Sequence, residues 1–201
     1  MTDLFSYIGI LVVFSITVTT TPGPNNIMLL SSGVNFGYRR SLPHILGINV
    51  GYNLLLLLTG LGLGEVFTHF PIVQTALKYT GSGYLAYLAW RIFKAGRPEA
   101  KEGATPLKFY QAFLFQYVNP KAWVMAIMVI SGFTDSMSDY SFGAHLFIII
   151  LVNILVSLFS ASLWTIGGVM IAKILHNNRI RFIFNSLLAI ALLGTIYWMV
   201  T

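Results

Sequence analysis

Thr21-Pro22-Gly23-Pro24-Asn25-Asn26 interrupts an apolar run, residues 4–38, that contains no Asp, Glu, Lys or Arg. The hydrocarbon core of a bilayer needs only ~20 helical residues to cross it, so this run is too long for one straight span. Proline has no backbone N–H and cannot continue a helix, so the two prolines break the run. We therefore predict a first membrane segment broken at membrane depth, whose free amide and carbonyl groups must be satisfied by protein, water or a ligand.

The rest of the chain has a similar composition. Of its 201 residues, 56% are hydrophobic and 9% are charged, and the mean hydropathy is +0.77. These values exclude an ordinary soluble domain and are typical of an all-α integral membrane protein. Read at ~20 residues per span, the charge-poor stretches predict six transmembrane helices. The predicted spans are roughly 4–36 with its break, 42–65, 72–93, 107–133, 143–172 and 182–200.

Basic residues alternate between the connections of these spans. They occur between spans one and two, around the connection of spans three and four, and before span six. The other connections contain no Lys or Arg, and their charged residues are all acidic. By the positive-inside rule the basic connections face the cytoplasm, so both termini lie outside. The net charge of +6 therefore indicates membrane sidedness and not nucleic-acid binding. The first basic residue is Arg39, so no cleavable signal peptide is predicted and the first span stays in the protein.

A polar linker divides the chain into two halves of three spans. We predict a single membrane transport domain, 1–201, composed of a first half (1–95), a cytoplasmic linker (96–106) and a second half (107–201). Because three is odd, the second half crosses the membrane in the opposite sense, as in transporters built from inverted repeats. The first span of each half is the broken one, since Asn119-Pro120-Lys121 interrupts the span 107–133. A weaker echo is a single Asn in an apolar helix of each half, Asn49 and Asn153.

The two breaks predict a binding pocket for a small molecule with a carboxylate. A half-helix that starts after a break presents free backbone N–H groups and the positive end of its dipole to an anion. Asn and Lys side chains beside the breaks add amide groups and one intramembrane positive charge, Lys121, whose default interpretation is functional. The alternatives are a surface loop at Pro22 and Pro24, and a Lys121 that extends to the membrane interface. The predicted substrate-binding residues are Pro22, Gly23, Pro24, Asn25, Asn26, Asn119, Pro120 and Lys121, with Tyr84 as a pocket wall.

Four side chains are candidates for carrying a coupling ion: Lys121, Lys78, Glu65 and His44. Lys78 is close enough to the outer end of its span to reach the headgroups, and it could pair with Glu65 at the same surface. His44 is expected to be a capped histidine near the cytoplasmic interface, with proton transfer as the alternative. No carboxylate lies deep in any predicted span.

The motifs of enzymes are missing from the sequence. It contains no nucleophile elbow, no His-Glu-x-x-His, no phosphate loop and no dinucleotide fingerprint. It contains no cysteine, which excludes disulfides and thiolate metal sites. We therefore expect no enzymatic activity, no catalytic residues, no cofactor and no metal.

Three motifs in this order resemble the LysE/RhtB family of amino-acid exporters. They are Thr21-Pro22-Gly23-Pro24-Asn25-Asn26, Gly81-x-x-Tyr84-Leu85-x-Tyr87-Leu88-x-Trp90 and Phe115-x-x-x-Asn119-Pro120-Lys121. The resemblance covers essentially the whole chain. Members of that family are multi-pass carriers of the bacterial inner membrane that export amino acids and related metabolites by exchange with protons. The resemblance implies that the residues of the first and third motifs line a transport path. The Asn25-Asn26 pair and the stretch 113–121 are most similar to the branch that exports cysteine and O-acetylserine or other neutral amino acids.

The leading hypothesis is thus a secondary exporter of small amino acids or related zwitterions, whose partners are the amino acid and the lipid bilayer. A channel built from the same broken helices is the first alternative. A non-transporting membrane subunit of a larger complex is the second. A second copy of the chain is a further candidate partner, and nucleic acid is not expected.

Overall fold

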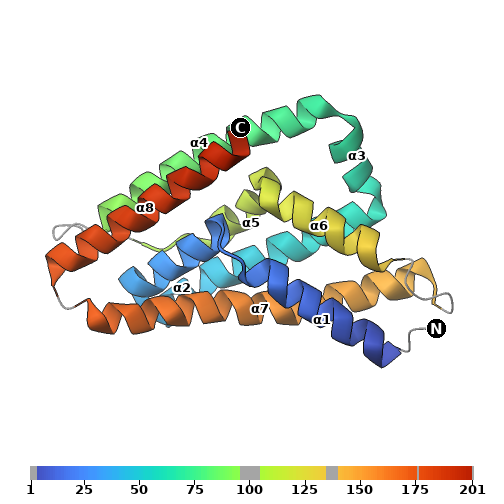
Figure 1. Ribbon diagram of the computed structural model, residues 1–201, viewed down its shortest axis with the longest axis horizontal. Coiled ribbons are helices and arrows are strands. Elements are labelled where there is room, and N and C mark those ends of the chain that lie inside the picture. The colour runs from blue at the N-terminus through green and yellow to red at the C-terminus, as the bar shows by residue number, and fades with distance from the viewer. Residues whose placement is uncertain (1–3, 96–104, 135–139, 176, 201) are drawn as a thin grey trace.

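The computed structural model describes residues 4–95, 105–134, 140–175 and 177–200, and every regular element in these ranges is a helix (Figure 1). The elements are α1 (Leu4–Thr20), α2 (Pro24–Leu58), a π-helical turn (Thr59–Leu63), α3 (Gly64–His69), α4 (Pro71–Ala95), α5 (Phe109–Val118), α6 (Pro120–Phe133), α7 (Phe142–Ile174) and α8 (Asn178–Val200).

Helix α2 is a hairpin of two helical arms. Gly37 has non-helical dihedral angles, φ 77° and ψ 172°, a left-handed conformation that glycine adopts without a steric penalty. The hydroxyl groups of Ser32 and Ser41 lie 2.7 Å apart, although nine residues of straight helix would separate them by about 13 Å. The chain therefore reverses at Gly37, and Figure 1 shows the two arms, residues 24–36 and 38–58, lying beside each other.

Both predicted breaks are present. The first helix ends at Thr20 and the next begins at Pro24, with Gly23 in an extended conformation between them. The second break is at Asn119, where α5 and α6 meet with a bend of 70°. In both places proline is the first residue of the following helix, a position where its missing N–H costs no hydrogen bond. The broken helices predicted from the prolines are therefore confirmed.

Three helical segments of the described residues are long and apolar enough to cross a membrane, and a fourth is obtained if the bent pair α5–α6 counts as one span. They are Pro24–Val66, Phe142–Ile174 and Asn178–Tyr197. Helix α1 is apolar but has only 17 residues. The all-helical membrane fold is thus confirmed at this level, and the arrangement of six spans in two inverted halves stays a prediction.

The centre of the fold is the packing of both arms of α2 against α7. In the first arm, a methyl group added at Gly33 would lie 2.1 Å from the carbonyl oxygen of Thr165, and one added at Gly168 would lie 2.2 Å from that of Leu30. Only glycine permits two helix backbones to approach so closely. The second arm runs antiparallel to α7, because Ile45 and Ile48 pack with Ala161 whereas Leu55 and Leu56 pack with residues nearer the start of α7.

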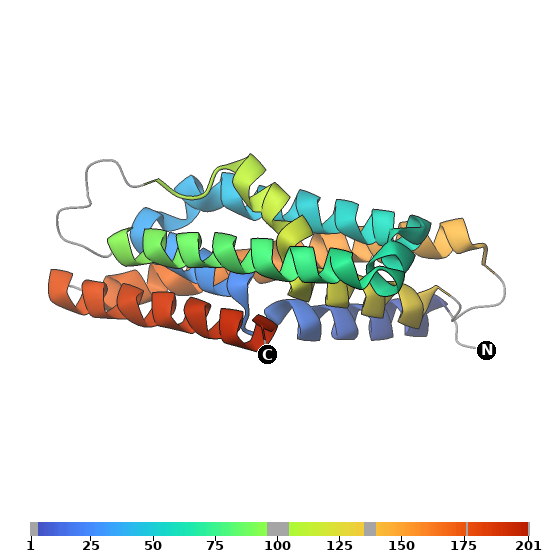
Figure 2. The ribbon, with the colours of Figure 1, turned by 90° about the horizontal axis from the view of Figure 1, so that it is seen from above.

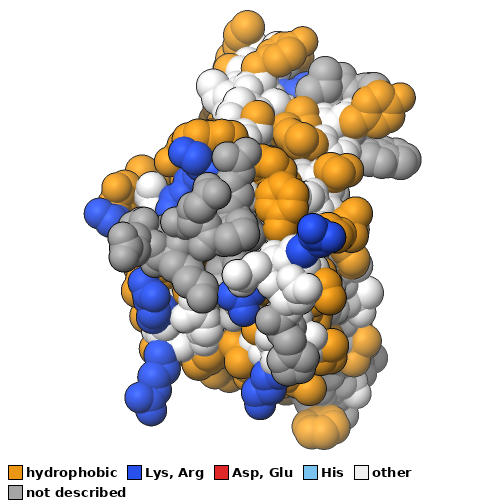
Figure 3. All heavy atoms as spheres, turned by 90° about the vertical axis from the view of Figure 1, so that its left-hand side faces the viewer, with side chains coloured by type: hydrophobic (Ala, Val, Ile, Leu, Met, Phe, Trp, Pro, Cys, Tyr) orange, Lys and Arg blue, Asp and Glu red, His pale blue; other side chains and the backbone are white. Residues whose placement is uncertain are grey.

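Helices α4 and α8 form a pair that lies beside this centre, as Figures 1 and 2 both show. The reversal at Gly37, the end of α4, the end of α7 and the start of α8 lie at one end of the molecule (Figure 1). Figure 3 shows Lys and Arg side chains gathered over that end. The basic connections predicted to share one side of the membrane thus share one end of the fold, although Arg97 and Lys101 lie outside the described residues. The orientation of that end stays a prediction.

Candidate substrate-binding site

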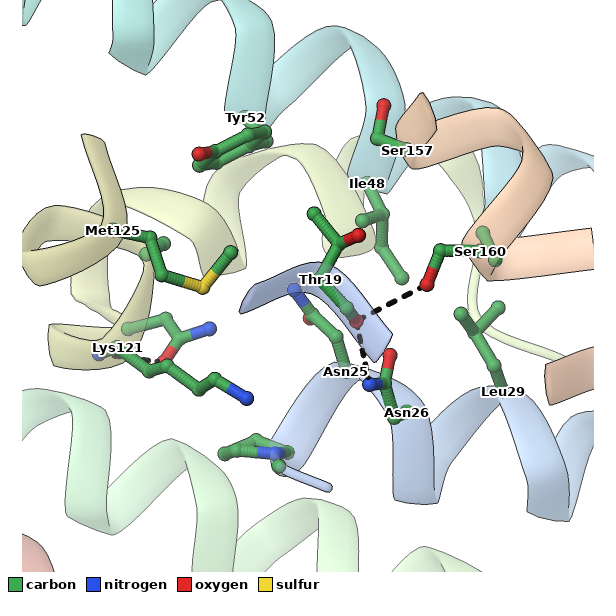
Figure 4. Close-up of a pocket in the computed structure, with 15 residues that line it drawn as sticks. Thr19, Asn25, Asn26, Leu29, Ile48, Tyr52, Lys121, Met125, Ser157 and Ser160 are labelled. Atoms are coloured by element: carbon green, nitrogen blue, oxygen red, sulfur yellow. Dashed lines mark hydrogen bonds between the residues drawn. The ribbon is translucent and has the colours of Figure 1, made fainter. Parts of the chain in front are cut away.

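The two breaks meet at one cavity of about 50 Å³. A buried water needs ~10–15 Å³ by the same kind of measure, so the cavity has room for a few waters or part of a small molecule. Figure 4 shows its walls, which come from both breaks, the second arm of α2, and α7. The lining residues are Thr19, Gly23, Pro24, Asn25, Asn26, Leu29, Ile48, Tyr52, Asn119, Lys121, Ala122, Met125, Ser157, Ser160 and Ala161.

The Lys121 ammonium joins the second break to the first. Its Nζ donates hydrogen bonds to the carbonyl oxygen of Thr21 at 2.9 Å, to the hydroxyl of Thr21 at 2.9 Å, and to the carbonyl oxygen of Pro22 at 3.2 Å. A helix that ends leaves carbonyl groups without partners and has the negative end of its dipole there, so a cation is favoured. Gly23 makes room for this contact, because a Cβ at that position would lie 2.9 Å from both Cδ and Nζ of Lys121.

Two further side chains close the end of α1. Asn26 Nδ2 donates to the carbonyl oxygens of Thr19 and Thr21, each at 2.8 Å. The hydroxyl of Ser160 on α7 donates to the carbonyl oxygen of Thr19 at 3.1 Å. The side-chain Nδ2 of Asn26 is therefore occupied by the carbonyl groups at the end of α1.

The start of α2 keeps donors free. Pro24 has no N–H, Gly23 provides no side-chain cap, and among the described residues the backbone N–H groups of Asn25 and Asn26 have no hydrogen-bond partner. The start of α6 differs, because Asn119 Oδ1 accepts a hydrogen bond from the Lys121 backbone N–H at 3.2 Å. Free backbone N–H groups are thus present at the start of α2, and their role in binding an anion stays a prediction.

Asn25 forms a reciprocal amide pair with a residue that the sequence analysis did not single out. Its Nδ2 donates to Gln116 Oε1 at 2.8 Å, and Gln116 Nε2 donates back to Asn25 Oδ1 at 3.2 Å. Gln116 is completely buried in α5, and Nε2 also donates to the carbonyl oxygen of Ala112 at 2.9 Å. Its position, a polar residue one turn before Asn119 in an apolar helix, is the feature of the sequence that could have identified it as a site residue. The pair is a second link between the two breaks, in addition to the bonds of Lys121 to the end of α1.

The rest of the lining is uncharged and partly apolar. Leu29, Ile48, Ala122, Met125 and Ala161 provide aliphatic surface. Lys121 is the only Lys, Arg, His, Asp or Glu among the residues lining the described cavity. The site therefore combines one positive charge, free N–H donors and an apolar surface, which suits a small molecule with a carboxylate.

The other predicted site residues lie outside this lining. Tyr84 packs on Phe115, with ring centroids 5.5 Å apart, and does not contact the cavity. Glu65 is exposed in α3 and Lys78 is partly buried in α4, and no ion pair joins them. His44 is 1% exposed and neither ring nitrogen has a hydrogen-bond partner among the described residues. The expectation of a capped histidine is therefore wrong, because His44 is buried within the protein without a hydrogen-bond partner for its ring, and its position relative to the membrane interface stays a prediction.

The sequence is similar to a known family of proteins and to individual members of known function. The sequence matches the LysE type translocator family over residues 16–195. It is 31% identical over 121 residues to the cysteine/O-acetylserine efflux proteins of Escherichia coli strain K12 and of Shigella flexneri, a match that covers 60% of this chain. The match spans 62% of the length of each of these relatives. No solved structure matches. The family match covers most of the chain and includes both helix breaks, so the protein belongs to the LysE type translocator family of membrane transporters.

Proposed function

We propose that this protein is a secondary exporter of small neutral amino acids and related zwitterions, such as cysteine and O-acetylserine, across the bacterial inner membrane. The observation that carries the proposal is the meeting of the two helix breaks at one cavity, with a cation beside free N–H groups. The efflux activity of similar proteins supports the same substrate class.

The charge of the cavity favours a substrate without net positive charge. The carboxylate would accept hydrogen bonds from the backbone N–H groups of Asn25 and Asn26 and would be attracted by Lys121. The substrate side chain would contact the apolar wall that includes Leu29, Ile48 and Met125. A second cation, as on lysine or arginine, would have no carboxylate to meet in the lining and would lie near Lys121 at the cost of like-charge repulsion.

The proposed architecture is six crossings in two inverted halves. The arms of α2, together with α1, account for spans one and two, and α4, the bent pair α5–α6, α7 and α8 account for the others. Rocking of the halves about the paired breaks would open the cavity to each side in turn. The basic end would face the cytoplasm, with both termini outside. We propose proton exchange as the coupling, with Lys121 as the titrating group that contacts the cavity.

The test is export by the intact protein. Overexpression in a bacterial host should raise the concentration of the transported amino acids in the medium, and cysteine and O-acetylserine are the first to be measured. Asn25→Ala should abolish the increase, because it breaks the Asn25–Gln116 pair at the cavity. Asn35→Ala is the matched control, because Asn35 forms a similar amide pair with Asn185 away from the cavity. No accumulation with the wild type, or full activity of Asn25→Ala, would contradict the proposal.

Counterflow in proteoliposomes separates a carrier from the alternatives. An exporter that alternates between two sides shows uptake of labelled substrate driven by unlabelled substrate inside. A channel does not show this stimulation. A non-transporting subunit shows no uptake and copurifies with other chains.

A further inference from the structure

A second polar cluster lies behind the cavity, where the second arm of α2 crosses α7. It consists of Asn49 and Asn53 on α2 and Asn153 and Ser157 on α7, all of them buried. Asn49 Nδ2 donates to Ser157 Oγ and to the carbonyl oxygen of Ile154, and Asn53 Nδ2 donates to Ser157 Oγ at 3.4 Å. The cluster is next to the cavity, because Ser157 belongs to both.

The cluster holds oxygen atoms that lack donors. Asn53 Oδ1 and Asn153 Oδ1 are fully buried and have no hydrogen-bond partner among the described residues. Their Nδ2 groups are occupied by the carbonyl oxygens of Asn49 and Ile149 on their own helices. The two helices are antiparallel and meet at Asn49 and Ser157, so Asn53 and Asn153 are each about one turn further toward the same end. Buried amide oxygens are nearly always hydrogen-bonded in proteins, so this pair is short of a donor.

The two helices carry the same pattern. On α2, Asn49 is followed four residues later by Asn53, and on α7, Asn153 is followed four residues later by Ser157. Both helices thus carry an Asn with a second polar residue one turn later. Each half thus contributes the same two positions to the cluster. Such an arrangement places acceptors from both halves at the point where the halves meet.

An ammonium group bound in the cavity would supply the hydrogen-bond donors that the cluster lacks. The walls of the cavity have free donors for a carboxylate at the first break but contain no acid for an ammonium group. Helix α7 and the second arm of α2 form the wall that faces the start of α2 (Figure 4), and polar groups in this wall can accept hydrogen bonds from the ammonium group of a bound α-amino acid. Tyr52 belongs to that wall, and its buried hydroxyl has no hydrogen-bond partner among the described residues.

Tyr52 and Ser157 line the cavity, and Asn53 and Asn153 lie behind them in the buried cluster. We propose that Tyr52 and Ser157, supported by the amide oxygens of Asn53 and Asn153, form the acceptor subsite for the substrate's ammonium group and thereby make the transporter selective for α-amino acids over carboxylates without an amine. This inference rests on the proposed function, and it adds the position of the second pole of the zwitterion. The neutral amide oxygens favour an ammonium group while adding no negative charge that would attract a dication.

The test compares two ligands on the same protein. L-Cysteine and 3-mercaptopropionate share the carboxylate and the thiol and differ by the amine. Inhibition of labelled cysteine counterflow by each compound is measured in proteoliposomes under reducing conditions, which is feasible because the protein itself contains no cysteine. The ratio of the two inhibition constants does not depend on the fraction of folded protein, so partial misfolding of a variant cancels.

Wild-type protein should prefer cysteine by about ten- to hundredfold, the range expected for hydrogen bonds to a charged group. Asn53→Leu and Asn153→Leu should each reduce this preference at least fivefold while the inhibition constant of 3-mercaptopropionate stays within twofold. Asn53→Ser keeps a polar group at this position, as Ser157 does on α7, and it replaces Asn53→Leu if the leucine variant does not fold. It should give an intermediate preference for cysteine. Asn35→Leu, outside the cavity, should leave the preference unchanged.

Two results would overturn the inference and leave the proposed function intact. One is an unchanged cysteine preference in the Asn53 and Asn153 variants. The other is an equal weakening of both ligands, which would assign the amide oxygens to buried water and helix packing. Failure of wild-type protein to transport cysteine at all would instead contradict the proposed substrate class.

Discussion

Substitution of Lys121 by alanine should destabilise the protein as well as stop export. The ammonium makes three hydrogen bonds to the end of α1, and two of the acceptors are backbone carbonyl groups, of Thr21 and Pro22. A hydrogen bond to a charged group contributes about 1.5–3 kcal/mol. Lys121 is only partly buried, and water entering the cavity would replace part of the loss, so we expect a net decrease in the free energy of unfolding of about 2–3 kcal/mol. For a chain of this size that is a fall in melting temperature of about 4–12 °C.

Gly23→Ala tests the same contact without removing the charge. Gly23 has φ −178° and ψ 179°, an extended conformation that alanine also adopts, so the backbone is not strained. The new Cβ would lie 2.9 Å from Cδ and Nζ of Lys121 and would displace the ammonium from the carbonyls. We expect a loss of about 1–2 kcal/mol, within the range for overpacked sites.

The two substitutions form a double-mutant cycle. Thermal unfolding in detergent, followed by tryptophan fluorescence, gives the stability of wild type, both single variants and the double variant. If Gly23→Ala acts through Lys121, it should have almost no effect in the Lys121→Ala background, because the side chain it displaces is gone. The stabilities would then be non-additive by about 1–2 kcal/mol. Additive effects, or a Lys121→Ala variant as stable as wild type, would refute the structural role of the ammonium.

Other expected outcomes follow from single contacts. Gly33→Ala should lower the free energy of unfolding by about 1–3 kcal/mol, because its Cβ would lie 2.1 Å from a carbonyl oxygen of α7; Gly83→Ala, which meets no atom within 4 Å, should leave the melting temperature unchanged or raise it. Gln116→Leu removes the amide partner of Asn25 and should reduce counterflow at least tenfold while the protein still reaches the membrane; normal counterflow would exclude the pair from the transport path. Gly37→Ala should cost about 1–2 kcal/mol at its φ of 77°, as measured by thermal unfolding, and an unaffected stability would mean that the reversal tolerates a side chain.

The helical membrane fold and the two breaks could be predicted from the sequence because each depends on local chemistry, and the family could be predicted from the resemblance of three motifs. Pro24 and Pro120 cannot donate the hydrogen bonds of a preceding helix, so the helices end before them wherever the segments lie. The expected spans agree with the helices to within a few residues at 107–133 and 143–172. The count of six crossings requires the membrane itself, which the packing of helices alone does not define.

The partners of the polar side chains could not be predicted in the same way. Lys121 was identified as a functional cation, but its acceptors lie in a segment 99 to 100 residues earlier in the chain. His44 was expected at an interface, and the packing of the second arm of α2 buries it. Gln116 lies within the third motif, but its role could not be predicted from the sequence. Its hydrogen-bond partner, Asn25, is brought to it only by the packing of the helices.

Sequence alone thus determined where the helices break and which solvent surrounds them, since proline geometry and apolar composition act over a few residues and do not depend on the rest of the fold. Only the tertiary structure decided which polar groups meet: the lysine with the end of α1, the amide pair across the breaks, and the asparagines of α2 with Ser157 and the Ile154 carbonyl of α7. Hydrogen bonds act over about 3 Å, so their partners are set by how helices distant in the chain pack.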